Sequence, residues 1–495
     1  MKIDHIIKLA VLAVGLLLAG CTPTPHDVQE VDALPHIFPD YVDVTVPADI
    51  APLNFNVVGD DVEAVQVTVK GDAGVDLVAS GNGNLADFDI DEWRALLDAN
   101  KGKTLKVSVM AEHAGQWKAY KAFTINVSSH ALEDYGLTYR RIAPGYEVYS
   151  KMGIYQRCLQ TFDEEPIIEN TIAPGACLNC HTSNATNPDQ FTFHVRGLNG
   201  ATMVQTGDHL EALKARNDSL GGSMVYPYWH PSGKYCAYST NMTHQAFHAV
   251  ANERIEVYDE ASDVFVYNPQ THEIIKDSLL FTDDHFETYP AFSPDGKTLY
   301  FVSSLSHAIP DEYKEIRYDL CAIAFDAEKG QYGDKVDTLF AASKQGKSLV
   351  MPRPSYDGRY LMFTLSDYGC FPIWHKEADL WLMDLQSGEV RPMDEVNSDD
   401  TESFHNWSSN SRWFVFSSRR GDGLYTRLYL SSIGDDGKAT KPFLLPQKNP
   451  QEYYDGTVYS FNVPDFTKRK VCLDAYDAAK KIRSEQRLTT KMKGM

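Results

Sequence analysis

The sequence predicts a mainly β protein in which a small Ig-like β-sandwich precedes a β-propeller. Two observations lead to this fold class. Short runs of alternating apolar and polar residues fill the stretch from 41 to 127, and a turn-and-strand unit recurs from about 220 to 465. Aromatic residues make up 12% of the chain, which suits strands because flat side chains pack well on a pleated surface.

The length and net charge of the chain limit the number of domains and the classes of function to be expected. At roughly 150 residues per domain, 495 residues correspond to two to four domains. The formal net charge of −22 argues against non-specific nucleic-acid binding, which needs a basic surface. After the N-terminal segment, no apolar run reaches the roughly 18 residues of a membrane-spanning helix, so the body is not expected to be an integral membrane protein.

The N-terminal residues predict export and lipid anchoring. Lys2 and Lys8 accompany an apolar run over 9–19, which is typical of a signal peptide, here 1–20. The run ends in LAGC, which resembles a bacterial lipobox with Cys21 as the lipidated residue; the alternative is a plain cleaved signal. Residues 21–38 then form a tether. We expect a protein on the periplasmic side of the cell envelope, with the outer membrane favoured because Thr22 follows the cysteine.

The predicted sandwich spans residues 39–128. Its strands are the period-2 runs at 42–46, 65–69, 105–109 and 123–127, separated by Gly, Asn and Asp turns. One stretch, 91–97, has helical character and interrupts the series. No residue type or spacing in this region indicates chemistry.

The region 220–465 contains an internal repeat. Its four copies read YPYWHPSGK at 226–234, YPAFSPDGK at 289–297, MPRPSYDGR at 351–359 and FHNWSSNSR at 404–412. Each precedes an apolar strand, at 235–239, 299–303, 360–364 and 413–417, and three acquire a further strand that begins at Asp263, Asp319 or Asp379. Repeats of about 50–60 residues with several strands each are typical of propeller blades. The strand-like segments 146–158, 191–205 and 457–463 can complete the ring, and six blades are favoured.

One motif in the segment 129–219 carries chemistry. Residues 177–181 read CLNCH, the attachment motif of c-type haem. The thiols of Cys177 and Cys180 would add to the two vinyl groups of one porphyrin, and His181 would bind the iron as proximal ligand. A structural disulfide, a redox-active pair and half of a zinc site are the alternatives.

The distal haem ligand stays open at this stage. His194 is the nearest histidine in sequence, Met203 and Met152 are thioether alternatives, and a five-coordinate iron is also compatible. Arg140, Arg157 and Arg196 are candidate partners of the haem propionates because guanidinium groups suit carboxylates.

The remaining cysteines and the C-terminal tail give weaker signals. No essential disulfide framework is expected from Cys158, Cys236, Cys321, Cys370 and Cys472. The tail, 466–495, is basic and has helical character, and we expect a solvated, partly disordered terminus.

The repeats resemble the PD40, or WD40-like, repeats of TolB-like propellers. The whole chain resembles Bacteroidetes-type lipoproteins that join a CxxCH segment to such repeats, through MGIYQR at 152–157, CLNCH at 177–181 and ESFHNWSSN at 402–410. This resemblance implies an architecture more than an activity.

Together these features predict a lipid-anchored monohaem c-type cytochrome that acts in electron transfer or docks a redox partner or envelope protein. The alternative is a TolB-like interaction scaffold without haem, in which Cys177 and Cys180 form a disulfide; a haem enzyme with an open distal position is a third reading. No catalytic residue is predicted. The GxSxG nucleophile motif is absent, so a hydrolase has no support.

Overall fold

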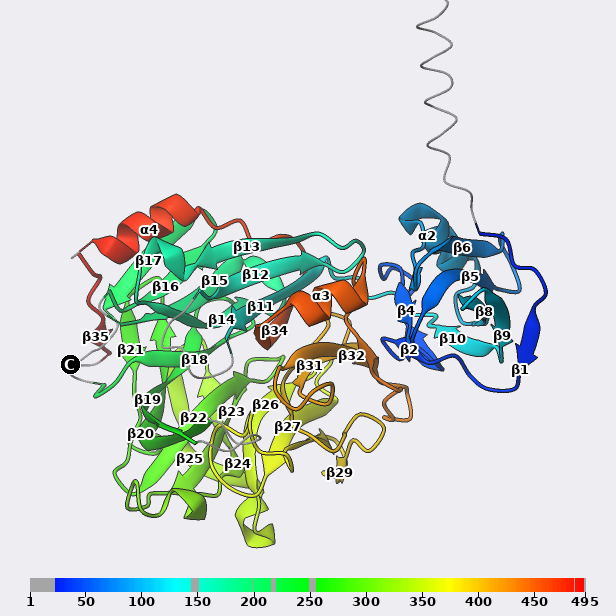
Figure 1. Ribbon diagram of the computed structural model, residues 1–495. Coiled ribbons are helices and arrows are strands. Elements are labelled where there is room, and N and C mark those ends of the chain that lie inside the picture. The colour runs from blue at the N-terminus through cyan, green and yellow to red at the C-terminus, as the bar shows by residue number, and fades with distance from the viewer. Residues whose placement is uncertain are drawn as a thin grey trace, which may run out of the picture. The chain divides into compact units, whose positions relative to one another are not determined.

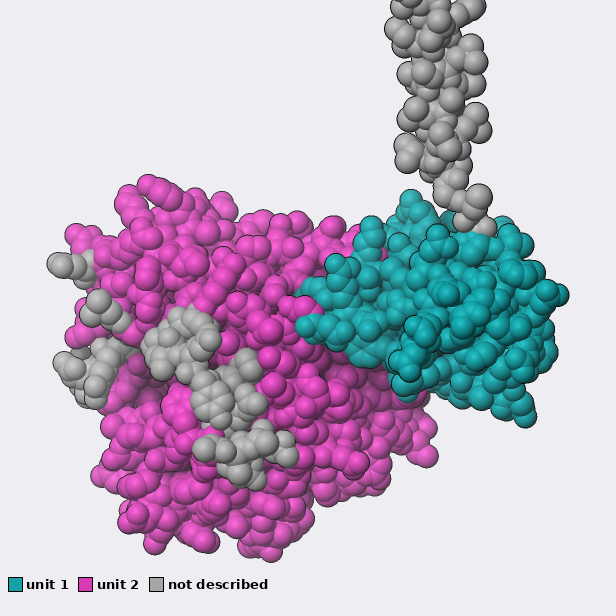
Figure 2. Space-filling view, viewed as in Figure 1, with its two compact units in different colours: residues 1–43, 52–127, 446–455 teal, residues 44–51, 128–445, 456–495 magenta. Residues whose placement is uncertain are grey.

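The computed structural model describes residues 23–143, 151–197, 199–214, 220–248, 255–484 and 486–493, and these residues are mainly β. They divide into two compact units (Figure 2). Unit 1 consists of residues 1–43, 52–127 and 446–455, and unit 2 of residues 44–51, 128–445 and 456–495. The lipidation residue predicted from the sequence, Cys21, and the signal peptide lie outside the described residues.

The described residues of unit 1 form two sheets and two short helices. One sheet has the order β1-β9-β8-β10, with β5 paired to β8 and β6 to β5, and the other has the order β2-β4-β7. Its strands are β1 (Gln29–Val31), β2 (Ile37–Phe38), β4 (Phe55–Val57), β5 (Val62–Lys70), β6 (Leu77–Asn82), β7 (Leu85–Ala86), β8 (Thr104–His113), β9 (Gln116–Tyr120) and β10 (Phe123–Val127). Buried and exposed residues alternate along β5 and β8, as the period-2 pattern predicts.

The helix predicted at 91–97 is confirmed as α2 (Ile90–Ala99). Asp89 caps its N-terminus by accepting hydrogen bonds from the backbone of Asp91 and Glu92, at 2.9 and 3.0 Å. Trp93, which belongs to this helix, has a buried side chain. The second helix of this unit, α3 (Pro450–Gly456), comes from a distant part of the chain and is preceded by Lys448, whose carbonyl accepts a hydrogen bond from Asn54 at 2.9 Å.

Unit 2 contains six sheets, counted over its described residues, and their strand pairs are antiparallel except for β21–β35 (Figure 1). In chain order, four of them are β14 (Cys177–Asn184) to β17 (His209–Lys214), β22 (His285–Phe292) to β25 (Gln331–Phe340), β26 (Ser348–Pro354) to β29 (Val390–Pro392), and β30 (Glu402–Trp407) to β33 (Phe443–Leu444). Within them lie β15 (Asn187–Arg196), β16 (Ala201–Thr206), β23 (Thr298–Leu305), β24 (Asp319–Asp326), β27 (Tyr360–Ser366), β28 (Asp379–Asp384), β31 (Trp413–Ser418) and β32 (Arg427–Ser432).

The other two sheets of unit 2 join distant parts of the chain. One has the order β13-β12-β11-β34, in which β11 (Gly136–Ile142), β12 (Gly153–Cys158) and β13 (Glu164–Glu169) pair with β34 (Ser460–Thr467). The other comprises β18 (Met224–Trp229), β19 (Cys236–Phe247), β20 (Ile255–Asn268) and β21 (Glu273–Ile275), with β35 (Lys491–Met492) added beside β21. The unit also holds β3 (Val44–Val46), α4 (Ala475–Arg483) and the 3₁₀ turns Asn170–Ile172, Tyr313–Glu315 and Ala342–Gln345.

One strand of each sheet takes part in a closed cycle of contacts. The cycle runs β14, β18, β22, β26, β30, β34 and back to β14. Core clusters fill the space between successive sheets: Leu320 and Leu361, for example, share one cluster, and Phe416 and Met362 share another. The strands that the sequence repeats predict at 235–239, 299–303, 360–364 and 413–417 are confirmed within β19, β23, β27 and β31.

All six strands of the cycle carry the same backbone irregularity. Each has a register shift, and each places one residue in the left-handed region, with φ between 47° and 57°. These residues are Cys180, Tyr226, Tyr289, Met351, Phe404 and Val463. Left-handed backbone is uncommon for such side chains, and bulges of this kind redirect side chains at a strand.

The prediction of a solvated C-terminal tail is wrong for α4. Ala478 and Ile482 are buried in the cluster that also contains Leu178 and Phe193, because the helix has one apolar face. After it, Lys491 pairs with Glu273 as β35 joins β21. The basic side chains Lys480 and Lys481 lie in the last turn of α4, where cations stabilise a helix terminus.

A buried carboxylate joins β34 to its two neighbours in the cycle. Asp465 Oδ2 accepts hydrogen bonds from the backbone N–H of Ser183 at 2.8 Å and from Thr182 Oγ1 at 3.2 Å. Its Oδ1 accepts one from Asn406 Nδ2 at 2.7 Å. Because Ser183 lies on β14 and Asn406 on β30, one side chain links three strands.

We expect Asp465→Ala to lower the free energy of unfolding. Truncation leaves buried donors on β14 and β30 without acceptors, and each unsatisfied buried donor costs about 1–3 kcal/mol. The measurement is the urea midpoint of the full chain, compared with Asp334→Ala, which removes an exposed carboxylate from β25. Equal midpoints for the two variants would contradict a linking role for Asp465.

The same residue gives a signed pH dependence. Burial raises the pKa of Asp465 to about 6, although hydrogen bonds from Ser183 and Thr182 and the charge of Arg353 oppose the rise. The folded state therefore binds the proton more tightly than the unfolded chain, and this contribution to stability falls as pH rises from about 4 to 6. Relative to Asp465→Asn, the wild type should lose stability across that window; a constant difference would contradict the raised pKa.

Candidate functional site

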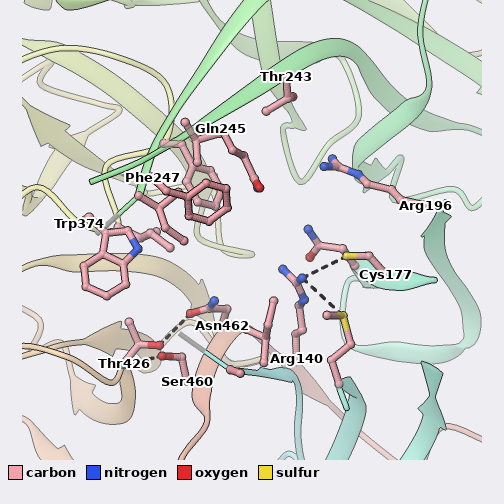
Figure 3. Close-up of a pocket in the computed structure, with 18 of the residues that line it drawn as sticks. Arg140, Cys177, Arg196, Thr243, Gln245, Phe247, Trp374, Thr426, Ser460 and Asn462 are labelled. Carbon is pink, nitrogen blue, oxygen red and sulfur yellow. Dashed lines mark hydrogen bonds between the residues drawn. The ribbon is translucent and has the colours of Figure 1, made fainter. Parts of the chain in front are cut away.

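A cavity of about 170 Å³ in unit 2 gathers arginine side chains from separate sheets. We call it the arginine cavity; Arg140, Arg196 and Arg419 line it, together with polar residues and an aromatic group (Figure 3). Its other lining residues include Cys177, Met152, Asn179, Tyr226, Phe247, Phe371, Trp374 and Asn462. None of the described residues that line it is Asp or Glu.

Arg140 enters the cavity from β11 and is almost completely buried, at 8% exposure. Its Nη2 donates to Cys177 Sγ at 3.2 Å and lies 3.8 Å from Met152 Sδ (Figure 3). Its Nε is buried without a hydrogen-bond partner among the described residues. A guanidinium that contacts two weakly accepting sulfur atoms retains capacity for an anion.

Arg196 enters the same cavity from the end of β15 (Figure 3). Burial lowers its pKa, but the neighbouring Cys180, Tyr226 and Asp259 raise it, and the net shift is upward. Burial raises the pKa of both Cys180 and Tyr226, so these two groups are neutral at pH 7 and leave the arginine charge in place. Within the described residues, neither Arg140 nor Arg196 has a carboxylate oxygen within 4.0 Å.

Other lining residues of the cavity supply an aromatic surface and hydrogen-bonding groups. The guanidinium carbon of Arg419 lies 3.6 Å from the centre of the Trp374 ring. Arg419 also donates to the carbonyls of Gly423 and Ile373. On β34, Asn462 Oδ1 accepts from Thr426 Oγ1 at 2.8 Å. The cavity thus combines guanidinium groups with an apolar, aromatic surface.

A second cavity, of about 40 Å³, is lined by strands of all six sheets, and we call it the ring cavity. Cys180 and His181 reach it from β14, and Arg353, His405 and Asp465 from β26, β30 and β34. Burial lowers the pKa of His181 and His405 to about 3, so both rings are neutral at pH 7. The ring of His405 donates from Nε2 to the carbonyl of Met362 at 3.0 Å.

The structure distributes the predicted haem-attachment residues over both cavities. Cys177 lines the arginine cavity, whereas Cys180 and His181 line the ring cavity. Both thiols are buried and unbridged. His181 is 2% exposed, and neither ring nitrogen has a hydrogen-bond partner of good geometry among the described residues, although the backbone of Thr138 raises its pKa slightly.

The predicted distal ligands lie on different faces of the β14–β17 sheet. His194 is buried and its Nδ1 forms a 2.9 Å hydrogen bond with Thr202 Oγ1, opposite it on β16. Met203 pairs with Phe193, one position along, and therefore lies on the other face. The ring of His181 packs 6.1 Å from that of Phe191, which shares the face of Phe193. The sheet thus separates His194 from His181.

These residues do not fit a covalently bound haem in the arrangement described. One porphyrin would have to reach both thiols and His181, but Cys177 and His181 open into different cavities. The cavity beside His181 measures about 40 Å³, whereas cofactor sites usually offer about 300–1,000 Å³. Nor does any group of three or more His, Cys, Asp or Glu side chains in the described ranges have metal-binding geometry.

The structure also shows which position the motif occupies in its strand. Cys180 and His181 occupy the position that Tyr226-Pro227 and Tyr289-Pro290 occupy in other sheets. In the fourth sequence repeat, Phe404-His405 has a histidine at the same position. The similarity of Cys180-His181 to Phe404-His405 could have indicated from the sequence that CLNCH belongs to the first strand of a sheet. The sequence interpretation missed it, together with Arg353, Trp374 and Arg419.

Comparisons with known proteins give a general likeness only. No family model matches the sequence, and no curated protein matches it. A puromycin-hydrolysing peptidase of Mycobacterium tuberculosis is 11% identical, with 85% of this chain and 57% of that chain covered and a TM-score of 0.35. A periplasmic gluconolactonase of Pseudomonas aeruginosa is 15% identical (67% and 99% covered, TM-score 0.36), and prolyl oligopeptidase B of Galerina marginata 13% (63% and 44%, TM-score 0.34).

This chain therefore spans 57% of the length of that peptidase and 44% of that of the oligopeptidase. Among the described residues, none of the helices has the length and apolar character needed to span a membrane.

Thiol labelling tests the state of the motif. Chain matured in a host with c-type haem machinery should label at Cys472 when native, because this is the exposed thiol among the described cysteines. After denaturation without reductant, Cys177 and Cys180 should both label. Peptide mass spectrometry reads each site.

The outcomes separate the readings of the motif. Labelling of the pair only after reduction would show a disulfide. A pair that stays blocked after reduction, with the mass of haem added, would contradict the conclusion that these residues do not fit a covalently bound haem.

Proposed function

We propose that unit 2 is a six-bladed β-propeller that binds a small organic anion in the arginine cavity. The observation that carries this proposal is the convergence of Arg140 and Arg196 on one cavity whose described lining holds no carboxylate. Burying a cation is costly unless it is paired, and a bound anion supplies the missing partner. Guanidinium groups are suited to carboxylates and phosphates because their N–H groups match two oxygens at once.

The closed cycle of strands supports the propeller architecture. Each of the six sheets contributes one strand to the cycle, and each of these strands has its bulge at the equivalent position. In β13-β12-β11-β34, strands from both ends of unit 2 form one sheet, which is how a propeller ring is closed. For unit 1, the two sheets support the expectation of an Ig-like sandwich that serves as a spacer.

The shape and surface of the cavity indicate the kind of anion. Trp374 and Phe247 offer apolar surface beside the guanidinium groups, and Asn179 and Asn462 offer amides. An anion with a flat apolar portion, such as an aryl carboxylate or aryl phosphate, would contact both the guanidinium groups and the apolar surface. The function that this lining supports is ligand binding.

Electron transfer through haem c stays the second candidate. What favours it is His181, a buried imidazole whose two nitrogens have no hydrogen-bond partner of good geometry among the described residues. What opposes it is the separation of Cys177 from His181 and the small volume beside the imidazole. Haem attachment would require the strands around the ring cavity to move apart.

Binding of phenyl phosphate tests the anion site. The full chain should bind phenyl phosphate and discriminate strongly against phenol, because only the phosphate pairs with the arginines. Charge-assisted hydrogen bonds contribute about 1.5–3 kcal/mol, so Arg140→Gln and Arg196→Gln should each weaken binding about tenfold to a hundredfold. Isothermal titration calorimetry provides the affinities.

Arg94→Gln is the matched control, because Arg94 lies on α2 in unit 1 and pairs with Asp91 on the exposed surface. Its affinity should equal that of the wild type. Similar binding of phenol and phenyl phosphate, or equal losses in all three variants, would contradict the proposal.

We further propose that Cys21 carries the lipid that tethers the protein to the outer membrane. The support is the apolar run 9–19 and the LAGC sequence that ends at Cys21. Several acyl chains at about 0.8 kcal/mol per buried CH₂ would anchor the chain durably. In cells fed an alkyne fatty acid, the wild type should be labelled and found in the membrane fraction. The Cys21→Ser variant should be unlabelled and absent from the membrane fraction. A labelled variant would contradict lipidation at this residue.

A further inference from the structure

Two buried glutamates occupy equivalent positions in two sheets of unit 2. Glu402 on β30 pairs with Ser418 on β31, and Glu287 on β22 pairs with Ser303 on β23. In both sheets the glutamate lies two residues before the left-handed residue of the first strand, Phe404 or Tyr289. The second strands therefore align so that Arg420 corresponds to Leu305.

In the β30 sheet, this glutamate is fully satisfied by its own chain. Arg420 Nη2 donates to Glu402 Oε1 at 2.9 Å, and Ser418 Oγ donates to the same oxygen at 2.7 Å. Ser398 adds its backbone N–H to Oε2 at 3.0 Å and its hydroxyl to Oε1 at 2.7 Å. The fully buried Glu402 carboxylate thus has a cation and several donors around it.

In the β22 sheet, the corresponding cation is missing. Leu305 stands where Arg420 stands, and it is 63% exposed. Glu287 is only 3% exposed, its Oε1 has a weak 3.5 Å contact with Ser303 Oγ, and its Oε2 has no hydrogen-bond partner within the described part of the chain. Burial, and then the charge of Asp263, raise the pKa of Glu287 to about 8.

The missing arginine leaves open space. Glu287 lines a groove of about 660 Å³, which we call the Glu287 groove; its other lining residues include Leu279, Leu305, Arg317 and Asp319. Asp319 is already occupied by the backbone N–H and hydroxyl of Ser343, at 2.7 and 2.9 Å. Arg317, the one cation in the described lining, donates to the carbonyl of Lys314 at 2.9 Å and forms no ion pair with Glu287.

We propose that the Glu287 groove binds an alkylguanidinium group, supplied by a ligand, in the place that Arg420 fills in the β30 sheet. The planar guanidinium would donate to Oε1 of Glu287, as Arg420 donates to Oε1 of Glu402, and its alkyl chain would lie against the exposed side chains of Leu279 and Leu305. This site takes a cation and lies on residues that the arginine cavity does not share, so it is independent of the proposed function.

The test uses Nα-acetylarginine amide and its neutral isostere, Nα-acetylcitrulline amide, titrated into the full chain. The arginine probe should bind at least tenfold more tightly than the citrulline probe. Glu287→Gln should weaken arginine-probe binding tenfold or more. Glu315→Gln, which neutralises an exposed carboxylate of the same groove, should leave it unchanged.

A second variant guards against a misfolded Glu287→Gln protein. Leu305→Arg should raise the melting temperature and abolish binding of the probe, because the chain then supplies its own guanidinium. Equal affinities for the two probes, absence of binding, or equal losses in Glu287→Gln and Glu315→Gln would overturn the proposal. A lower melting temperature for Leu305→Arg would overturn the equivalence with Arg420.

Discussion

The buried carboxylate of Asp465 is the interaction on which the arrangement of unit 2 depends. It lies on β34, accepts hydrogen bonds from Ser183 on β14 and Asn406 on β30, and so joins segments about 280 and 59 residues away in sequence. Long-range closure of this kind costs chain entropy that local contacts do not repay. Because β34 also pairs with β11, the same link positions Arg140 and Asn462 at the arginine cavity.

Both proposed sites contain buried ionisable side chains that have no ion-pair partner among the described residues. A solitary buried ion is unfavourable, and a fold retains it when another group supplies the opposite charge. In the arginine cavity these ionisable groups are the guanidinium groups of Arg140 and Arg196; in the Glu287 groove the group is a carboxyl whose pKa burial raises to about 8, so a bound cation would favour its ionised form. The sheet that contains Glu402 shows the same chemistry completed within the chain, by Arg420.

Much of the fold could be predicted from the sequence because its cause is local. The turn at Ser293-Pro294-Asp295-Gly296 shows this: Gly296 has φ 72°, and the Ser293 hydroxyl donates to Asp295 at 2.6 Å. Such turns, each followed by a strand of alternating apolar and polar residues, can be recognised as a repeat in the amino-acid sequence. Closure by β34 and the packing of α4 depend on contacts between distant segments, which no local pattern encodes.

The candidate site was less predictable, for a related reason. CLNCH drew attention to a cofactor, whereas Cys180 and His181 stand at the bulge that every sheet of the cycle has. Arg140 and Arg196 were identified as anion partners from their proximity in sequence to the motif, and the structure brings both to Cys177. Arg157 lies elsewhere, with its guanidinium 6.0 Å from the ring of Phe162. Arg419 and Trp374 come from more than 170 residues away, beyond the reach of motif reading.

The most direct test of anion binding is a diffraction experiment on crystals soaked with 4-bromophenyl phosphate, recorded at the bromine and iron absorption edges. The account predicts a bromine peak beside Trp374 or Phe247, with phosphate oxygens within hydrogen-bond distance of Arg140 and Arg196, and no iron peak. A bromine peak confined to other surfaces, or an iron peak next to His181, would contradict it.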